Sequence, residues 1–101
     1  MDDEVMRLWR AHVQDRFNQG DYAEHLAPGE YAAIIRNGEM RATELITALM
    51  RVAADRGESV PQLLADPVVR HQLRAVGATA TGGAFDDDAL DREIGALGWL
   101  T

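Results

Sequence analysis

The chain of 101 residues contains no cysteine, and arginine accounts for all ten of its basic residues, so lysine is absent as well. Without thiols the protein cannot form disulfides, thiolate metal sites or a cysteine nucleophile. Without a lysine amine it has neither a Schiff-base residue nor the lysine of a phosphate-binding loop. These two absences exclude several large classes of enzymes.

Membrane-spanning and secretory signals are also lacking. No run of apolar residues approaches the roughly 18 that a membrane span needs. The opening residues Met-Asp-Asp-Glu are acidic, whereas a signal peptide begins with positive charge. The hydrophobic fraction of 47% is nevertheless sufficient for a packed core. We therefore expect a globular cytoplasmic protein that does not bind membranes.

Positive charge is scarce, because 17 acidic residues stand against 10 basic ones and the formal net charge is -7. Such a field repels nucleic-acid phosphates and anionic lipid surfaces, and it attracts basic proteins. We therefore expect no direct contact with nucleic acid, and we expect a protein partner that is itself basic.

Apolar residues recur at helical spacings, and no segment alternates apolar and polar residues as a strand would. The sequence predicts an all-α protein, a compact bundle of five or six short helices in a single domain over residues 1–101. The buried face of the first helix is expected to carry Val5, Leu8, Trp9, Val13 and Phe17, with His12 at the rim of the core. The helix over 40–56 is the most apolar, so we expect it at the centre of the core with Met50 on its buried face.

Glycine, proline and capping residues predict where the helices begin and end. Gly20, Asn37-Gly38, Gly57 and Gly77 are expected to end helices. Ser59 with Gln62 forms a capping-box pattern, and Asp66-Pro67 and Phe85-Asp86 are typical helix starts. The uncharged, small residues over 78–84 predict a flexible connection before the last helix.

An acidic cluster at the start of the last helix is the densest group of charges in the chain. It consists of Asp86, Asp87, Asp88 and Asp91. Its spacing does not match a calcium-binding loop, because Leu97 stands where a carboxylate ligand would be needed. We expect no metal, no cofactor and no catalytic residue. The cluster is expected to contact a partner protein, with Trp99 or Trp9 as the apolar anchor.

The run from Asn37 to Met50, Asn-Gly-Glu-Met-Arg-Ala-Thr-Glu-Leu-Ile-Thr-Ala-Leu-Met, resembles a helix of the small helical antitoxins of Fic-type toxins. The resemblance covers residues 7–50. In that family an earlier helix carries a glutamate that pairs with a toxin arginine. Asp15, Gln19 and Gly20 stand at the similar places in this sequence, with Gln19 at the position of that glutamate. The resemblance implies a small protein that works by covering another protein.

These observations predict a non-enzymatic binding module that masks or neutralises a partner protein, as antitoxins, immunity proteins and inhibitors do. A homodimer is compatible with the same pattern. Two alternatives stay open. One is a helical bundle that binds or transforms a small molecule in a pocket between its helices. The other is a dimeric helix-turn-helix regulator built from the least acidic stretch, residues 51–76.

Overall fold

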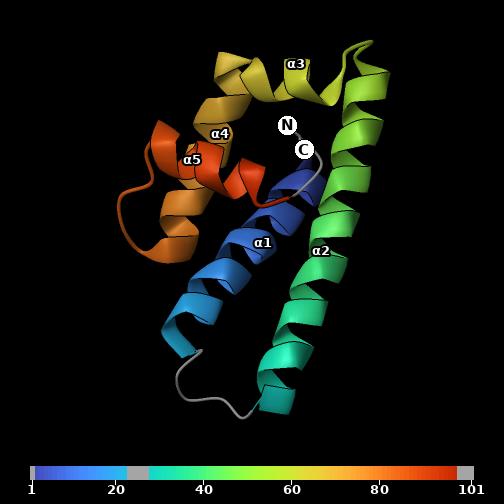
Figure 1. Cartoon of the computed structure of the whole chain (residues 1–101). Helices are drawn as coiled ribbons and strands as arrows, with labels where there is room; N and C mark the ends of the chain where they lie inside the picture. The colour runs from blue at the N-terminus through green and yellow to red at the C-terminus, as the bar shows by residue number, and fades with distance from the viewer. Residues whose placement is uncertain (1, 23–27, 98–101) are drawn as a thin grey trace.

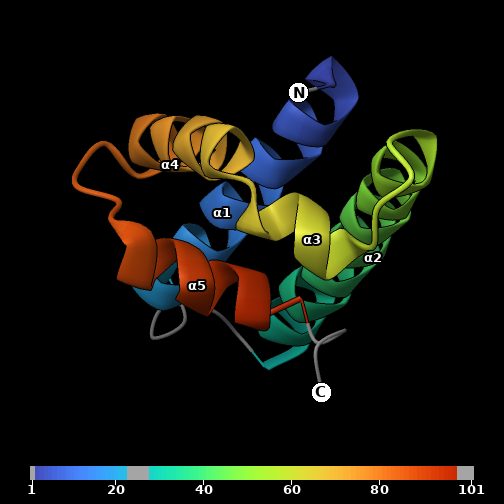
Figure 2. The ribbon, with the colours of Figure 1, turned by 90° about the horizontal axis from the view of Figure 1, so that it is seen from above.

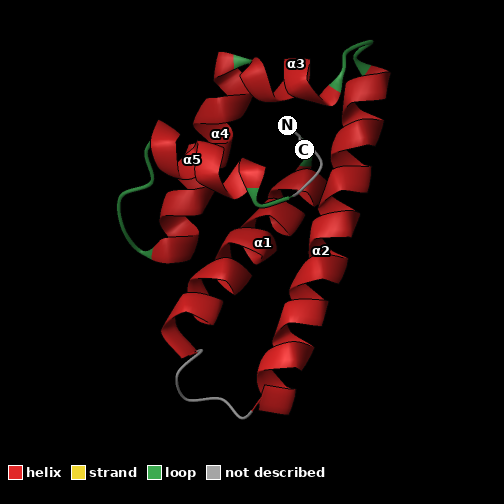
Figure 3. Ribbon diagram, viewed as in Figure 1, coloured by secondary structure: helices red, strands yellow, loops and turns green. Residues whose placement is uncertain are grey.

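The computed structural model describes residues 2–22 and 28–97, and in this part of the chain all regular structure is helical. The helices are α1 (Asp3–Tyr22), α2 (Pro28–Asp55), α3 (Val60–Ala65), α4 (Pro67–Thr81) and α5 (Asp87–Gly95). Short loops join the helices from α2 onward (Figure 3). The predicted all-α bundle of five or six helices is therefore confirmed, with five helices described.

The first helix, α1, occupies the middle of the bundle. It packs against α2 on one side and α4 on the other, while α3 bridges the ends of α2 and α4 (Figures 1 and 2). Val5, Leu8, Trp9 and Val13 of α1 are all buried, whereas Phe17, expected on the same face, is 44% exposed. The expectation that residues 40–56 form the centre of the core is wrong, since α2 lies at an edge and only one of its faces is covered.

The predicted break at Asn37-Gly38 does not occur. Residues 28–55 form one continuous helix, so two expected helices merge into α2. A glycine inside a helix costs only about 1 kcal/mol relative to alanine, less than the backbone hydrogen bonds that a turn at this point would remove. The predicted end at Gly20 is wrong for α1 as well, because this helix continues to Tyr22.

The capping signals between α2 and α4 are confirmed. Gly57 has a left-handed φ of 70° after the end of α2. Ser59 and Gln62 form a reciprocal capping box at the start of α3. Asp66 is the N-cap of α4, accepting a hydrogen bond from the Val68 amide at 2.8 Å. These side chains satisfy amides that a helix start leaves without partners.

The expected flexible connection over 78–84 is mostly helix. α4 runs past Gly77 to Thr81, and Gly82, with a φ of 69°, ends it instead. Gly77 is buried under the ring of Phe85, and a Cβ built on Gly77 would lie 2.6 Å from the Phe85 Cδ1 atom. The absence of a side chain at Gly77 therefore lets the loop after α4 fold back over its own helix.

Candidate functional site

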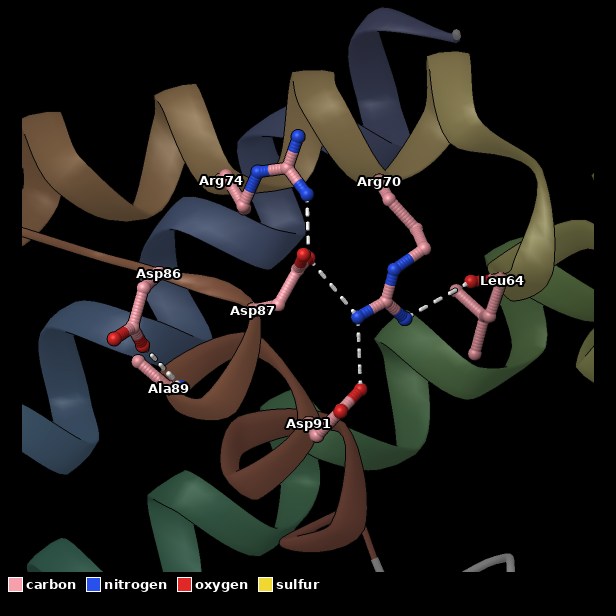
Figure 4. Close-up of polar contacts among 7 residues, drawn as sticks. All are labelled: Leu64, Arg70, Arg74, Asp86, Asp87, Ala89 and Asp91. Atoms are coloured by element: carbon pink, nitrogen blue, oxygen red, sulfur yellow. Dashed lines mark hydrogen bonds and ion pairs between the residues drawn. The ribbon is translucent and has the colours of Figure 1, made fainter.

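The acidic cluster at the start of α5 is largely engaged within the chain (Figure 4). Asp86 is the N-cap of α5 and accepts a hydrogen bond from the Ala89 amide at 2.9 Å. Asp87 and Asp91 both accept hydrogen bonds from Arg70 of α4, at 3.2 and 2.9 Å. Asp87 also pairs with Arg74, and this hydrogen bond holds the pKa of the Asp87 carboxyl below its ordinary value. These pairs attach α5 to α4.

The sequence predicts Trp9 or Trp99 as the anchor for a partner, and the structure describes Trp9. Trp9 is only 1% exposed, its ring lies edge-on to Phe85, and its indole Nε1 donates a hydrogen bond to the Leu73 carbonyl at 2.9 Å. It is therefore a core residue, and the prediction that it contacts a partner is wrong. Trp99 lies outside the described residues. Asp88 is exposed and stays available as a predicted contact.

His12 lies deeper than the core rim expected for it, since the residue is 4% exposed. Its Nε2 donates a hydrogen bond to the Glu93 carbonyl of α5 at 3.2 Å, and Arg16 pairs with the Glu93 carboxylate. Burial lowers the pKa of His12 below its ordinary value of 6.5, because the charged imidazolium would lose hydration there. His12 and Arg16 thus hold α5 against α1.

An open cleft of about 300 Å³ lies beside His12, between α1, α2 and the end of α5. Its ionisable lining residues are His12, Asp15, Arg16 and Glu39. Its apolar walls include Ile35, Ala42, Ile46 and Leu97. The Asp15 carboxylate is already paired with Arg41, whose Nη1 lies 2.5 and 2.7 Å from its two oxygens.

A second surface runs along the solvent-facing side of α2, and we call it the outer stripe. It consists of Met40, Thr43, Thr47, Met50 and Ala54. All five residues are exposed, and Met40 and Met50 are 65% and 59% exposed. Met50 was expected on the buried face, so that prediction is wrong. Figures 1 and 2 both show α2 as one edge of the molecule.

The two threonines make the outer stripe less polar than its composition indicates. The Thr43 hydroxyl donates to the Glu39 carbonyl and the Thr47 hydroxyl to the Thr43 carbonyl, both at 3.0 Å. Because these hydroxyls already have partners within α2, burying them against another surface would leave no donor unsatisfied. The sequence shows that these five positions are uncharged and recur at helical spacing. Only the structure shows that no other described element covers them.

The stretch considered for a helix-turn-helix has no free basic surface. Only Asp66 separates α3 from α4. All four arginines of residues 51–76 are paired with carboxylates: Arg51 with Glu4, Arg56 with Glu58 and Asp66, Arg70 with Asp87 and Asp91, and Arg74 with Asp87. Phosphate groups would have to compete with these carboxylates for the same guanidinium donors.

Among the described residues, no group of three or more histidine or acidic side chains is placed to hold a metal ion. Within the same part of the chain, no helix combines the length and apolar character that a membrane span requires. In comparisons with known proteins, no family model, no curated protein and no solved structure matches the chain. The candidate surfaces are therefore interpreted from their own geometry and chemistry.

Proposed function

We propose that this protein is a non-catalytic binding module that covers part of another protein, and that the outer stripe of α2 is its contact surface. The observation that carries the proposal is the run of five exposed, uncharged positions along one helix in a chain where 27% of residues are charged. Solvent-facing positions of a helix are ordinarily polar or charged. An uncharged exposed face is the feature by which an amphipathic helix docks against a partner.

The chemistry of the outer stripe suits a protein rather than a small ligand. Methionine is unbranched and polarisable, so Met40 and Met50 can adapt to the shape of an opposing surface. The stripe extends over 14 residue steps of a helix, or about 21 Å at 1.5 Å per residue. The resemblance of residues 7–50 to antitoxins of Fic-type toxins supports the same class of function. The net charge of -7 keeps a basic protein among the partners to be tested.

Site-specific photo-crosslinking tests this proposal. A photoreactive amino acid replaces Thr47 in the outer stripe, and in a control chain it replaces His71 on an exposed position of α4. We expect a crosslinked adduct to a second polypeptide chain from position 47 and none from position 71. Equal yields from the two positions, or no adduct from position 47, would contradict the proposal.

The cleft beside His12 favours a second candidate function, the binding of a small molecule. Of the two carboxylates that line it, Asp15 is paired with Arg41, whereas Glu39 makes no ion pair with the described residues, and the lining guanidinium of Arg16 is paired with Glu93. This lining suits an organic cation with an apolar body. Benzylamine is a suitable probe in an NMR titration, with Glu39→Gln as the matched variant. Shifts confined to the cleft that weaken in the variant would support this candidate, and the absence of shifts would remove it.

A further inference from the structure

The outer stripe follows the spacing of a coiled-coil seam. Its members lie three, four, three and four residues apart. This alternation corresponds to the core positions of a heptad repeat, which keep facing a partner helix over successive turns. Any straight stripe along an α-helix has this spacing, so the spacing allows a partner helix without selecting one. The charged residues beside the stripe give the stronger indication.

If the helix opposite the stripe is α2 of a second copy, the two helices can run antiparallel or parallel. The residues beside the stripe distinguish these two orientations. One flank carries Glu44 and Arg51, and the other carries Glu39, Ile46 and Ala53. In an antiparallel pair of identical helices the same flanks meet, so Glu44 would face Arg51 of the second copy, and this pairing occurs twice. In a parallel pair opposite flanks meet, and Glu44 would face Glu39 of the second copy.

The second flank carries no such pair. Ala53 is 2% exposed and belongs to the core, and Glu39 and Ile46 line the cleft beside His12. Arg51 is already 2.7 Å from Glu4, and both side chains are about half exposed. A guanidinium has five N–H donors, so Arg51 can keep its hydrogen bond to Glu4 and donate to a second carboxylate. Glu44 is exposed and makes no ion pair with the described residues.

We propose that the outer stripe is the interface of an antiparallel homodimer, in which α2 of one copy packs against α2 of the other. This inference rests on the proposed function, since it names the protein that the outer stripe contacts. Because the seam is only about 21 Å long, the dimer dissociates on dilution. Its two Glu44–Arg51 contacts set the orientation, and the methionines supply most of the apolar contact.

Sedimentation equilibrium over about 10 µM to 1 mM protein tests the self-association. We expect a reversible dimer for the natural chain and at least a tenfold weaker one for Met50→Glu. The matched control is Val68→Glu, which changes an equally exposed apolar residue on α4 (66% exposed) and should leave the dimer unchanged. Circular dichroism establishes that both variants remain helical. A natural chain that stays monomeric throughout this range would overturn the inference.

Charge exchange tests the orientation. Glu44→Arg alone places like charges opposite each other at both contacts of an antiparallel dimer and should weaken it about tenfold. Adding Arg51→Glu restores opposite charges and should recover the dimer. A parallel dimer would instead be strengthened by Glu44→Arg, because the new arginine would face Glu39. That result would overturn the antiparallel arrangement.

The crosslinking experiment at position 47 separates this inference from the proposed function. An adduct of twice the mass of the chain supports both. An adduct to a different protein from a natural chain that is monomeric supports the proposed function and overturns the homodimer.

Discussion

The side chain of Trp9 links α1 to α4, two helices that are far apart in the sequence. Its indole Nε1 donates to the Leu73 carbonyl, 64 residues further along the chain. Replacing it by phenylalanine removes the donor, leaves that carbonyl without its partner and opens a small cavity. We expect Trp9→Phe to lower the free energy of unfolding by about 2 kcal/mol. Urea unfolding followed by circular dichroism measures this change, and Arg10→Ala, at an exposed neighbouring position, should alter it little.

Gly77 is expected to resist substitution although it lies inside a helix. Alanine is ordinarily favoured over glycine there by about 1 kcal/mol. At this position, however, its Cβ would overlap the Phe85 ring, with ring atoms 2.6 to 2.8 Å away. We expect Gly77→Ala to destabilise the protein by about 1 to 3 kcal/mol. Thermal unfolding shows whether the substitution lowers or raises stability. Gly95→Ala in α5, where a Cβ would have no other atom within 4 Å, serves as the comparison. Stabilisation by Gly77→Ala would show that the ring can move aside.

His12 makes the stability of the protein depend on pH in mildly acidic solution. Its pKa is lowered in the folded state by burial, so below pH 6.5 the unfolded chain binds a proton that the folded chain does not. Stability should therefore fall as the pH drops below 6.5, until the pKa of the folded state is reached. The carboxyls of Asp66 and Asp87 have pKa values lowered from 3.8, so their stabilisation is lost only in more acidic solution.

Urea unfolding at pH 7.5 and pH 5.5, values chosen on either side of the ordinary histidine pKa of about 6.5, checks this dependence. The natural chain should be less stable at the lower pH. His12→Gln should flatten the dependence, whereas the same change at the exposed His71 should preserve it. A natural chain equally stable at both values would show that the imidazole does not resist protonation.

Within the acidic cluster at the start of α5, one aspartate caps the helix and another does not. Asp86 caps the helix, whereas Asp88 in the same turn is exposed and makes no hydrogen bond with the described residues. We expect Asp86→Ala to cost about 0.5 to 2 kcal/mol of stability. Asp88→Ala should cost much less, and Asp86→Asn should largely keep the cap. Chemical unfolding of the three variants measures the differences. A loss at Asp88 equal to that at Asp86 would contradict the capping role.

The sequence predicted helix ends correctly where a side chain or a left-handed glycine fixes the local backbone. Gly57, Ser59 and Asp66 act through neighbours within a few residues, so their patterns suffice. At Gly38 and Gly77 the prediction was wrong. Gly38 stays helical because a glycine inside a helix costs only about 1 kcal/mol relative to alanine, whereas Gly77 is covered by a side chain from beyond its own turn. The ring that covers Gly77 belongs to Phe85, and no short-range pattern encodes that packing.

The candidate surfaces were less predictable from the sequence, because they depend on which helix occupies the centre of the bundle. The acidic cluster was recognised, but its pairing with Arg70 and Arg74 requires knowing that α4 and α5 fold against each other. Trp9 is buried, as the periodicity of the first helix predicted, and is therefore not the partner anchor. Met50 was expected on the buried face but is exposed. The error at Met50 follows from expecting residues 40–56 at the centre of the core, a position that α1 holds.

Across the whole molecule, stability should be uneven. In α2 the buried side chains begin at Leu45, and none of the described side chains from 29 to 44 is buried. Local opening is easiest where few apolar contacts must break. We expect backbone amides over 32–40 to exchange with solvent much faster than those over 45–53, as measured by hydrogen exchange and mass spectrometry. Uniform protection along α2 would mean that this helix opens as one unit.

The central place of α1 has a consequence for the synthesis of the protein. α1 is translated before α4, and Leu73, whose carbonyl accepts the hydrogen bond of Trp9, follows Trp9 by 64 residues. At roughly 5 to 20 residues per second the delay is about 3 to 13 seconds. During that time the nascent chain presents Val5, Leu8, Trp9 and Val13 without their α4 partners. Molecular chaperones that bind apolar segments at the ribosome would therefore find an exposed target in α1.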